Sequence, residues 1–526
     1  MALTDLSNAE FPKDLLCTVC VIGSGPGGAL LAVELAKMGC DVLVLETGYS
    51  DPDMDVTRSI HTSSALGGAT LRFGFSRQLG GSSNLWAGRV APFEAADFWE
   101  KMSKPLGGWP FGLDELHPYY AKAAGILNIP YEALWPTSKP DSPLNTPGDF
   151  GNVFSGGTLD VKKFFWNKPP FNTGNYLKAA AKNNECLRVF LGAHVRHLEQ
   201  DKDTGRVISA RVASPAKREL KIKASFFVLA AGGLETPRIM LNSRSVSAQG
   251  IGNQNDMVGR CLVTHPKADL GVLVLKKREP THHPLFNDSA MANGQVRYGL
   301  GLSQSGAVPE NALNHYVQLS PLLEYRLNNF FDKAKGNSLL ASPFIDRSKF
   351  LRGFLPSLGL MAYETIGRLA GIQRSARLFV LRAFLDQYPS LENRVSLSSQ
   401  LDFYGDNKID IAWKLTEEDK FSVRQFISVL DKEIQKLGLG TVESLLPEMD
   451  EWPLIGIHSH FIGTTRMGHD PKTSVVDENC AVHGVPNLFI SGPSVFSTGG
   501  YANPFFTISA LSLRLAKHLR QRLEMK

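Results

Sequence analysis

Three glycines near the amino terminus have the spacing of a phosphate-binding turn. Gly23, Gly25 and Gly28 lie in the segment Val21–Gly28 in the pattern Gly-x-Gly-x-x-Gly. Gly23 permits a tight turn from strand to helix, Gly25 allows the backbone to approach a pyrophosphate, and Gly28 allows helix and strand to pack closely. The positive end of the following helix then faces the phosphates. This spacing predicts a nucleotide-binding loop.

The flanking residues supply the elements that must position this loop. Apolar patterns predict a strand over Cys17–Ile22, a helix over Ala29–Met38 and a second strand over Val42–Glu46. Glu46 follows Gly28 by 18 residues and is expected to accept hydrogen bonds from a ribose. A carboxylate there repels a 2′-phosphate, which disfavours NADP. The motif alone does not choose between FAD and NAD, and a βαβ unit without nucleotide is the alternative.

The segment Leu66–Gly88 is rich in glycine and other small residues. Such residues suggest a backbone pressed against a large flat group, and an isoalloxazine ring fits this better than a nicotinamide. A flexible surface loop is the alternative. Leu85 and Trp86 are of the buried type and argue against that alternative.

A second Rossmann-like portion is predicted further along the chain. Strand patterns cover Arg188–Leu191, His194–Glu199, Arg206–Ala213 and Leu220–Ala231, and Thr236–Pro237 is expected to open a helix. The predicted fold class is α/β, with a Rossmann-like FAD-binding domain intertwined with a second α+β substrate domain. The FAD-binding domain is expected over 1–100, 186–268 and 450–526, and the substrate domain over 101–185 and 269–449.

Composition excludes several classes of function. The net charge is only +5, and no basic tract accompanies it, so no nucleic-acid partner is expected. No apolar run reaches membrane-spanning length, and the polar start lacks the core of a secretion signal, so the expected location is cytoplasmic. Cys17 and Cys20 form a CxxC pair, but the strand pattern around them favours two buried core cysteines over a redox or metal pair.

One stretch, residues 347–382, mixes arginines and a lysine with large apolar residues. Such a stretch can lie on an anionic membrane surface. A pair of helices with solvated arginines is the alternative.

The carboxyl-terminal part carries a further set of motifs. SHFIGTTRMG covers Ser459–Gly468, and GGYANP covers Gly499–Pro504. Together with the first glycine motif they accompany GGSSNLW at Gly80–Trp86, AAGGLETPRIMLNS at 230–243, MVGRCLVTHP at 257–266 and ENRVSL at 392–397. In this order the motifs resemble those of the glucose-methanol-choline (GMC) oxidoreductases over nearly the whole chain. Within this family the chain resembles the sugar-acting branch, which includes pyranose oxidase and flavin subunits of bacterial sugar and polyol dehydrogenases.

The resemblance implies roles for particular residues. The catalytic histidine falls on His460, and its partner falls on Asn503. The position that can bond the flavin covalently is Leu85, so the FAD is expected to be noncovalent. Trp86 departs from the commonest family pattern and favours the sugar branch. The cofactor-binding residues are expected to be Gly23, Gly25, Gly28, Glu46, Gly80, Gly81, Ser82, Ser83, Asn84, Trp86, Val195, Ala231, Gly232 and Pro504.

General chemistry supports the same pair. Neutral histidine is suited to removing a hydroxyl proton near neutral pH, and an amide beside it can donate to the developing alkoxide. Three alternatives stay open: Asn503 could cap the following helix, His458 and His460 could be metal ligands, and either could be a core residue. The core interpretation is preferred for His458, and no metal is expected. His265 could lie close to the flavin or end a strand, and it is assigned no role.

The predicted function is oxidation of a primary or secondary alcohol of a sugar, glycoside or polyol to a carbonyl, with hydride transfer to FAD. The electron acceptor, whether dioxygen, a quinone or a protein carrier, and the oligomeric state are left open. A redox-neutral lyase on the same scaffold and a noncatalytic dinucleotide-binding module are the alternatives.

Overall fold

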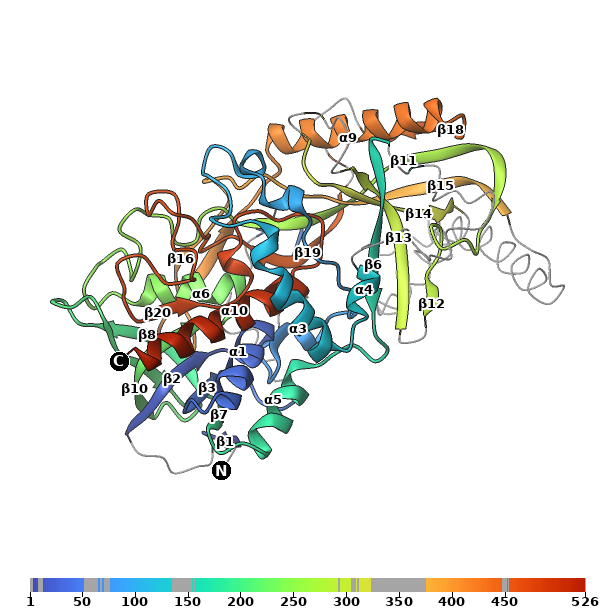
Figure 1. Ribbon diagram of the computed structural model, residues 1–526. Helices are drawn as coiled ribbons and strands as arrows, with labels where there is room; N and C mark the ends of the chain where they lie inside the picture. The colour runs from blue at the N-terminus through green and yellow to red at the C-terminus, as the bar shows by residue number, and fades with distance from the viewer. Residues whose placement is uncertain are drawn as a thin grey trace, which may run out of the picture.

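Two eight-stranded β-sheets form the framework of a computed structural model of the chain (Figure 1). The structure describes residues 3–7, 13–51, 65–66, 69–70, 76–134, 154, 157–291, 294–303, 309, 312–322, 375–446, 452 and 454–525. Helices pack on both sheets, so the predicted α/β class is confirmed.

The first sheet is largely parallel. Its order is β1 (Leu3–Asp5), β7 (Leu187–Leu191), β3 (Val42–Glu46), β2 (Asp14–Ile22), β10 (Glu219–Leu229), β9 (Val207–Ala213) and β8 (His194–Gln200). The last two strands are antiparallel, and β20 (Leu488–Ile490) pairs in parallel with the end of β10. The central strands are apolar because helices and loops bury both faces of a parallel sheet. The strands predicted in both Rossmann-like portions are confirmed.

Besides α6 (Gly232–Asn242), four helices of the described residues lie on the side of the first sheet. They are α1 (Pro26–Lys37), α3 (His117–Leu127), α5 (Thr173–Lys182) and α10 (Phe505–Glu524), and α10 lies beside α1 and α3 (Figure 1). Cys17 and Cys20 are buried in β2, and burial raises the pKa of the Cys20 thiol well above its usual value. The interpretation of this pair as core cysteines is therefore confirmed.

Helix α6 (Gly232–Asn242) begins before the predicted Thr236–Pro237 start. Pro237 lies inside the helix and has no N–H to donate to the carbonyl of Gly233, four residues earlier. The buried hydroxyl of Thr464 donates to that carbonyl at 2.7 Å instead. The prediction was wrong because a hydroxyl distant in the sequence replaces the missing backbone bond.

The second sheet is antiparallel. Its order is β12 (Ser289–Met291), β13 (Gly294–Leu302), β14 (Tyr316–Pro321), β15 (Ser375–Phe384), β11 (Val263–Pro280) and β18 (Gly440–Ser444), with β6 (Leu159–Trp166) on β13 and β19 (Leu454–Ile462) on β11. Helix α9 (Glu417–Lys436) lies beside β18 (Figure 1). Its Phe426 and Leu430 pack into a core with Leu273 and Phe379. The predicted domain division assigns residues 450–526, and with them β19, to the FAD-binding domain. Backbone hydrogen bonds nevertheless join β19 to β11 of the second sheet.

The remaining described elements are short. A hairpin of β16 (Arg394–Leu401) and β17 (Asn407–Ala412) and the pair β4 (Ala65–Leu66) and β5 (Ala69–Thr70) stand apart from the large sheets. The others are α4 (Tyr131–Leu134), η1 (Gly81–Asn84), η2 (Ala95–Phe98), η3 (Glu100–Ser103), η4 (Leu113–Glu115) and η7 (Pro493–Val495).

The basic stretch at 347–382 is only partly described. Residues 347–374 lie outside the described residues. Residues 375–382 belong to strand β15, whose Phe379 and Leu381 are buried in the second core. A helical arrangement is therefore wrong for this part. Among the described helices, none combines the length and apolarity that crossing a bilayer requires.

The hydroxyl of Thr464 should stabilise the fold measurably. Thr464→Val leaves the Gly233 carbonyl buried without a donor, so we expect the free energy of unfolding to fall by about 1–3 kcal/mol. Thr464→Ser keeps the hydroxyl and should lose less. Urea unfolding followed by circular dichroism measures both variants, and equal losses would contradict this interpretation.

Candidate active site

A cavity of about 600 Å³ lies between the two sheets and the start of α10. Its volume is within the range of pockets that hold cofactors and substrates, about 300–1,000 Å³. Gly23 and Gly25 of the nucleotide motif line it, and so do His460 and Asn503. The fold thus brings the predicted catalytic pair and the glycine loop to one cavity.

The glycine loop has the geometry that its spacing predicts. Gly23 has a φ of +106°, and a Cβ there would come within 2.5 Å of the carbonyl oxygen of Ala230. A Cβ on Gly28 would overlap the carbonyl of Gly23, so only glycine allows α1 to pack this closely on the turn. A Cβ on Gly25 would meet no protein atom within 4 Å and would project toward the cavity.

Glu46 lines the cavity at the end of β3 and is 7% exposed. Its carboxylate accepts hydrogen bonds from the N–H and hydroxyl of Ser24, at 3.1 and 2.6 Å, and from the N–H of Gly48 at 2.9 Å. These bonds fix the carboxylate beside the glycine loop. Its predicted contact with a ribose stays a prediction.

The second glycine segment forms a tight turn beside the cavity. The hydroxyl of Ser83 donates to the carbonyl of Gly80 at 2.7 Å, and the amide of Asn84 donates to the carbonyl of Gly81 at 2.8 Å. The ring of Trp86 stacks on Phe505 at 3.9 Å. Leu85, expected to be buried, is 57% exposed because it faces the cavity that it lines.

A β-bulge positions His460. The pairs Val263–Ile462 and His265–His458 are two residues apart on β11 and four apart on β19. The additional residues of β19 include His460, and such a bulge redirects a side chain. His458 pairs through its backbone, and its side chain lies outside the described residues.

The bulge places the imidazole of His460 against that of His265. Their Nδ1 atoms are 2.9 Å apart, and Nε2 of His265 lies 3.3 Å from the carbonyl oxygen of Gly499. Burial lowers the pKa of His265 to about 4. His265 is therefore neutral near pH 7, and one hydrogen joins the two rings.

Asn503 approaches the cavity from the start of α10. Its amide nitrogen donates one hydrogen to the carbonyl of Arg89 at 3.0 Å, so the second N–H is available for another acceptor. The N-cap residue of α10 is Pro504, and no side chain caps this helix. The alternative that Asn503 caps α10 is therefore wrong.

Buried polar groups hold the turn that carries Asn503. The hydroxyl of Tyr501 donates to Glu94 at 3.0 Å, and Lys162 pairs with the same carboxylate at 2.7 Å. Beside them, burial and the charge of Glu94 raise the pKa of Asp97 to about 7. A Cβ on Gly500 would come within 2.9 Å of the Asp97 carboxyl, so the turn packs directly on this group.

Comparison with known proteins identifies the family. GMC oxidoreductase models match residues 172–267 and 389–512, and an FAD binding domain model matches residues 16–59. The chain belongs to the GMC oxidoreductase family. Like its relatives it is an FAD-dependent oxidoreductase acting on CH–OH donors.

Relatives of this GMC oxidoreductase match over most of its length. It is 23% identical to the fructose dehydrogenase large subunit of Gluconobacter japonicus, over 96% of this chain and 98% of the relative. It is 25% identical to paromamine 6′-oxidase of Streptomyces fradiae, over 96% and 91% of the two chains. The structure of pyridoxine 4-oxidase from Mesorbium loti shares the fold, with a TM-score of 0.59 and 18% identity over 96% of this chain and 99% of that one.

The residues of this GMC chain fit FAD. The glycine at position 25 leaves room for a pyrophosphate, at the positive end of α1. Of the predicted cofactor-binding residues, those that line the cavity are Gly23, Gly25, Glu46, Gly81, Ser82, Trp86, Val195, Ala231, Gly232 and Pro504. Those that do not line it are Gly28, Gly80, Ser83 and Asn84, which shape the two glycine turns.

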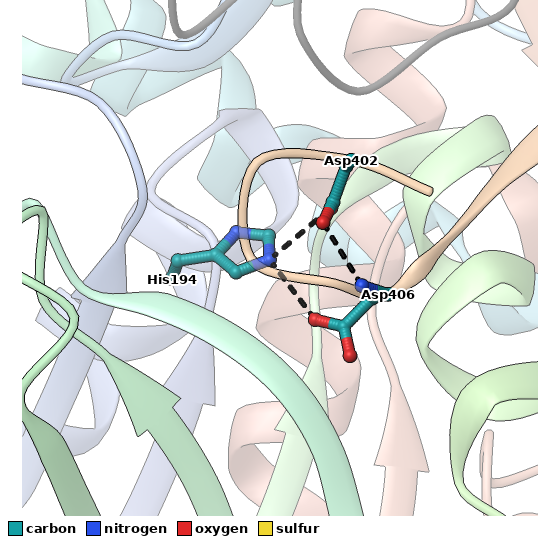
Figure 2. Close-up of side chains that lie close together, drawn as sticks. All are labelled: His194, Asp402 and Asp406. Atoms are coloured by element: carbon teal, nitrogen blue, oxygen red, sulfur yellow. Dashed lines mark hydrogen bonds and ion pairs between the residues drawn. The ribbon is translucent and has the colours of Figure 1, made fainter. Parts of the chain in front are cut away.

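Three buried side chains, His194, Asp402 and Asp406, lie close together (Figure 2), and His194 lines the cavity. Nε2 of His194 is 3.8 Å from Asp402 and 3.7 Å from Asp406. Arg238 contacts Asp402 at 3.2 Å, and Arg196 contacts Asp406 at 3.1 Å. Burial lowers the pKa of His194, and a metal ion would face two guanidinium groups. These residues therefore form an ion-pair network that ties β8 to the loop before β17.

Sequence reasoning missed several residues of the site. His265 contacts His460, and Arg89, Lys267, Tyr316, Gln318 and Phe384 line the cavity. The sequence does contain one indication of this site: His265 and Lys267 are two residues apart, so on a strand both side chains lie on the same face. Their partners lie on strands distant in the sequence, so the spacing alone did not show that this face lines a site.

The open space beside Gly25 predicts a selective loss of FAD affinity. Gly25→Ala should leave the melting temperature of the apoprotein unchanged, because the new Cβ meets no protein atom, and should weaken FAD binding at least about tenfold. Titration by flavin fluorescence measures the dissociation constant. Gly125→Ala on α3, also free of contacts, is the matched control. Unchanged FAD affinity in Gly25→Ala would refute the assignment.

Proposed function

We propose that this enzyme oxidises an alcohol group of a sugar, glycoside or polyol to a carbonyl, with His460 as the general base. The observation that carries the proposal is the convergence of His460 and Asn503 on the cavity that the glycine loop also lines. Relatives named for fructose and paromamine support the substrate class. Both are oxidoreductases, so the lyase and the noncatalytic alternatives are not favoured.

FAD supplies, when bound, the acceptor for the hydride of the carbinol carbon. Gly23, Gly25 and Glu46 would hold its nucleotide part, beside the start of α1. At position 85 a leucine has no nucleophilic atom, so we propose that the flavin is held without a covalent bond.

The hydrogen bonds of His265 support Nε2 as the basic nitrogen of His460. The carbonyl of Gly499 only accepts hydrogen bonds, so the hydrogen of neutral His265 lies on Nε2. Nδ1 of His265 then accepts, and the hydrogen between the rings belongs to Nδ1 of His460. Nε2 of His460 therefore carries the lone pair that removes the hydroxyl proton.

Asn503 acts on the carbinol oxygen as its negative charge develops. The bond to the carbonyl of Arg89 fixes the plane of the amide, and its second N–H can donate to that oxygen. Since the bond exists before substrate binds, the donor needs no reorganisation during the reaction.

Replacement of His460 tests the general base. His460→Ala should retain FAD and slow anaerobic flavin reduction by at least about a hundredfold, the usual scale for losing acid–base catalysis. Stopped-flow bleaching of the flavin by a panel of sugars and polyols measures the rate. His469→Ala, at an exposed histidine, serves as control. A wild-type flavin that no carbinol reduces would exclude the proposed function, and an unchanged rate in His460→Ala would exclude the role of this residue.

His265 is expected to act through His460 as a positioning residue. His265→Leu removes the acceptor for Nδ1–H, so the limiting rate of flavin reduction should fall about tenfold or more, with little change in substrate affinity. His265→Gln keeps an acceptor and a donor and should restore most of the rate. A purely structural role predicts no such rescue, and equal rates in the two variants would support it.

A further inference from the structure

The face of the second sheet that lines the cavity carries two rows of aligned side chains. Tyr316, Phe384 and Lys267 are cross-strand neighbours on β14, β15 and β11. The next row along the same strands is Gln318, Arg382 and Asp269. Lys267 and Gln318 both line the cavity, so the sheet presents a cation and an amide to it.

Lys267 has no carboxylate partner among the described residues. Its ammonium lies 5.2 Å from the centre of the Phe384 ring, and no ion pair joins it to a described side chain. Burial, with repulsion from Arg382 and Arg89, lowers the pKa of Lys267 to about 8. A half-buried cation without a counter-charge is costly, and an anion brought into the cavity would offset that cost.

The ion pairs of the neighbouring cations differ in exposure. The side chains of Arg382 and Asp269 are 24% and 22% exposed, whereas those of Arg89 and Asp288 are 29% and 38% exposed and lie 3.6 Å apart. The Arg89 guanidinium also lies 4.6 Å from the centre of the Trp166 ring. An exposed pair at that distance is weak. Arg89 lines the cavity and can therefore join Lys267 in binding an anion.

These cations lie close to the groups that act on the carbinol. Lys267 follows His265 by two residues on β11, a spacing of about 7 Å along a strand. The carbonyl of Arg89 holds the amide of Asn503. A substrate with its carbinol at His460 and Asn503 therefore extends toward Lys267 and Arg89 within the length of a few bonds.

We propose that the substrate carries an anionic group, a carboxylate or a phosphate ester, which Lys267 and Arg89 bind while the carbinol lies at His460. This inference rests on the proposed function and narrows its substrate class to sugar or polyol acids and phosphates. The ammonium supplies a point charge, and the guanidinium supplies paired donors. The same charges repel a cationic substrate.

Matched substrates that differ only in charge test the proposal. Glucuronate with glucuronamide, galacturonate with galacturonamide, and glucose 6-phosphate with glucose are titrated anaerobically into FAD-loaded His460→Ala enzyme, in which oxidation is slowed. Calorimetry measures each dissociation constant. At least one anion should bind at least about tenfold more tightly than its neutral counterpart, and the carboxylate and phosphate arms show which group is preferred. Equal affinities within every pair overturn the proposal.

Variants of Lys267 separate its charge from its shape. Lys267→Met should abolish most of the preference for the anion and leave the affinity for the neutral partner within about threefold. Lys267→Arg should retain the preference, and so should Lys163→Met, which removes a half-buried lysine of β6 that does not line the cavity. A preference that survives in Lys267→Met overturns the assignment of this residue.

The affinity for the anion should also fall as the pH rises above about 8, because free Lys267 then loses its proton. The groups that face Lys267 from its own and the neighbouring elements are His265, Asp269, Arg382, Tyr316, Arg89 and His460. Lys267→Arg holds its charge at these pH values and should remove the dependence. If the affinity of Lys267→Arg for the anion falls in the same way above about pH 8, the pH dependence belongs to another group.

Flavin bleaching by the wild-type enzyme separates this inference from the function on which it rests. Reduction by neutral polyols without any charge preference in binding overturns the anion site and leaves the function standing. A charge preference in binding without reduction by any carbinol supports the anion site and excludes the function.

Discussion

The imidazoles of His460 and His265 meet only because strands β11 and β19 pair out of step. Without the bulge that contains His460, strict alternation would carry its side chain to a different position relative to the cavity. Each neutral ring has one N–H, and the carbonyl of Gly499 can only accept a hydrogen bond. His265 therefore donates to Gly499 and accepts from His460. In the proposed mechanism this one backbone carbonyl selects the basic nitrogen of His460, and the later steps depend on that choice.

The site is assembled where the two sheets meet. The first sheet contributes the glycine loop and Glu46, whose positions follow from a short local segment. The second sheet contributes cavity-lining residues of β11, β14 and β15, together with His265 and His460. The start of α10 contributes Asn503. Thr464 connects these parts, because its hydroxyl binds α6 of the first half at the end of the bulged strand. The segment around residues 460–466 therefore contributes both to stability and to the proposed catalysis.

Features of the fold and the site could be predicted from the sequence where neighbouring residues determine them, and not where residues distant in the sequence do. The loop at Gly23–Gly28 and the strands around it need only neighbouring residues, and they were predicted correctly. His460 and Asn503 were proposed through a family resemblance, which stands in for long-range information. His265 was assigned no role and Lys267 was missed, since their partners lie about 195 and 117 residues away on strands whose register no local pattern reveals. The start of α6 and the strand within the basic stretch were missed for the same reason, because distant contacts override local propensity.

On strand β11, the proposed anion-binding residue Lys267 lies two residues from His265, which contacts the proposed base His460. A cation close to a developing alkoxide stabilises it, so Lys267 and Arg89 could in principle act on the carbinol oxygen themselves. If they bind an anionic group of the substrate, that group screens their charge from the reacting oxygen. The stabilisation of the alkoxide must then come from the amide of Asn503, a neutral donor whose strength the anion does not cancel, and from transfer of the proton to His460. A neutral donor beside the proposed base therefore suits a site in which, as proposed, the positive charge binds the substrate.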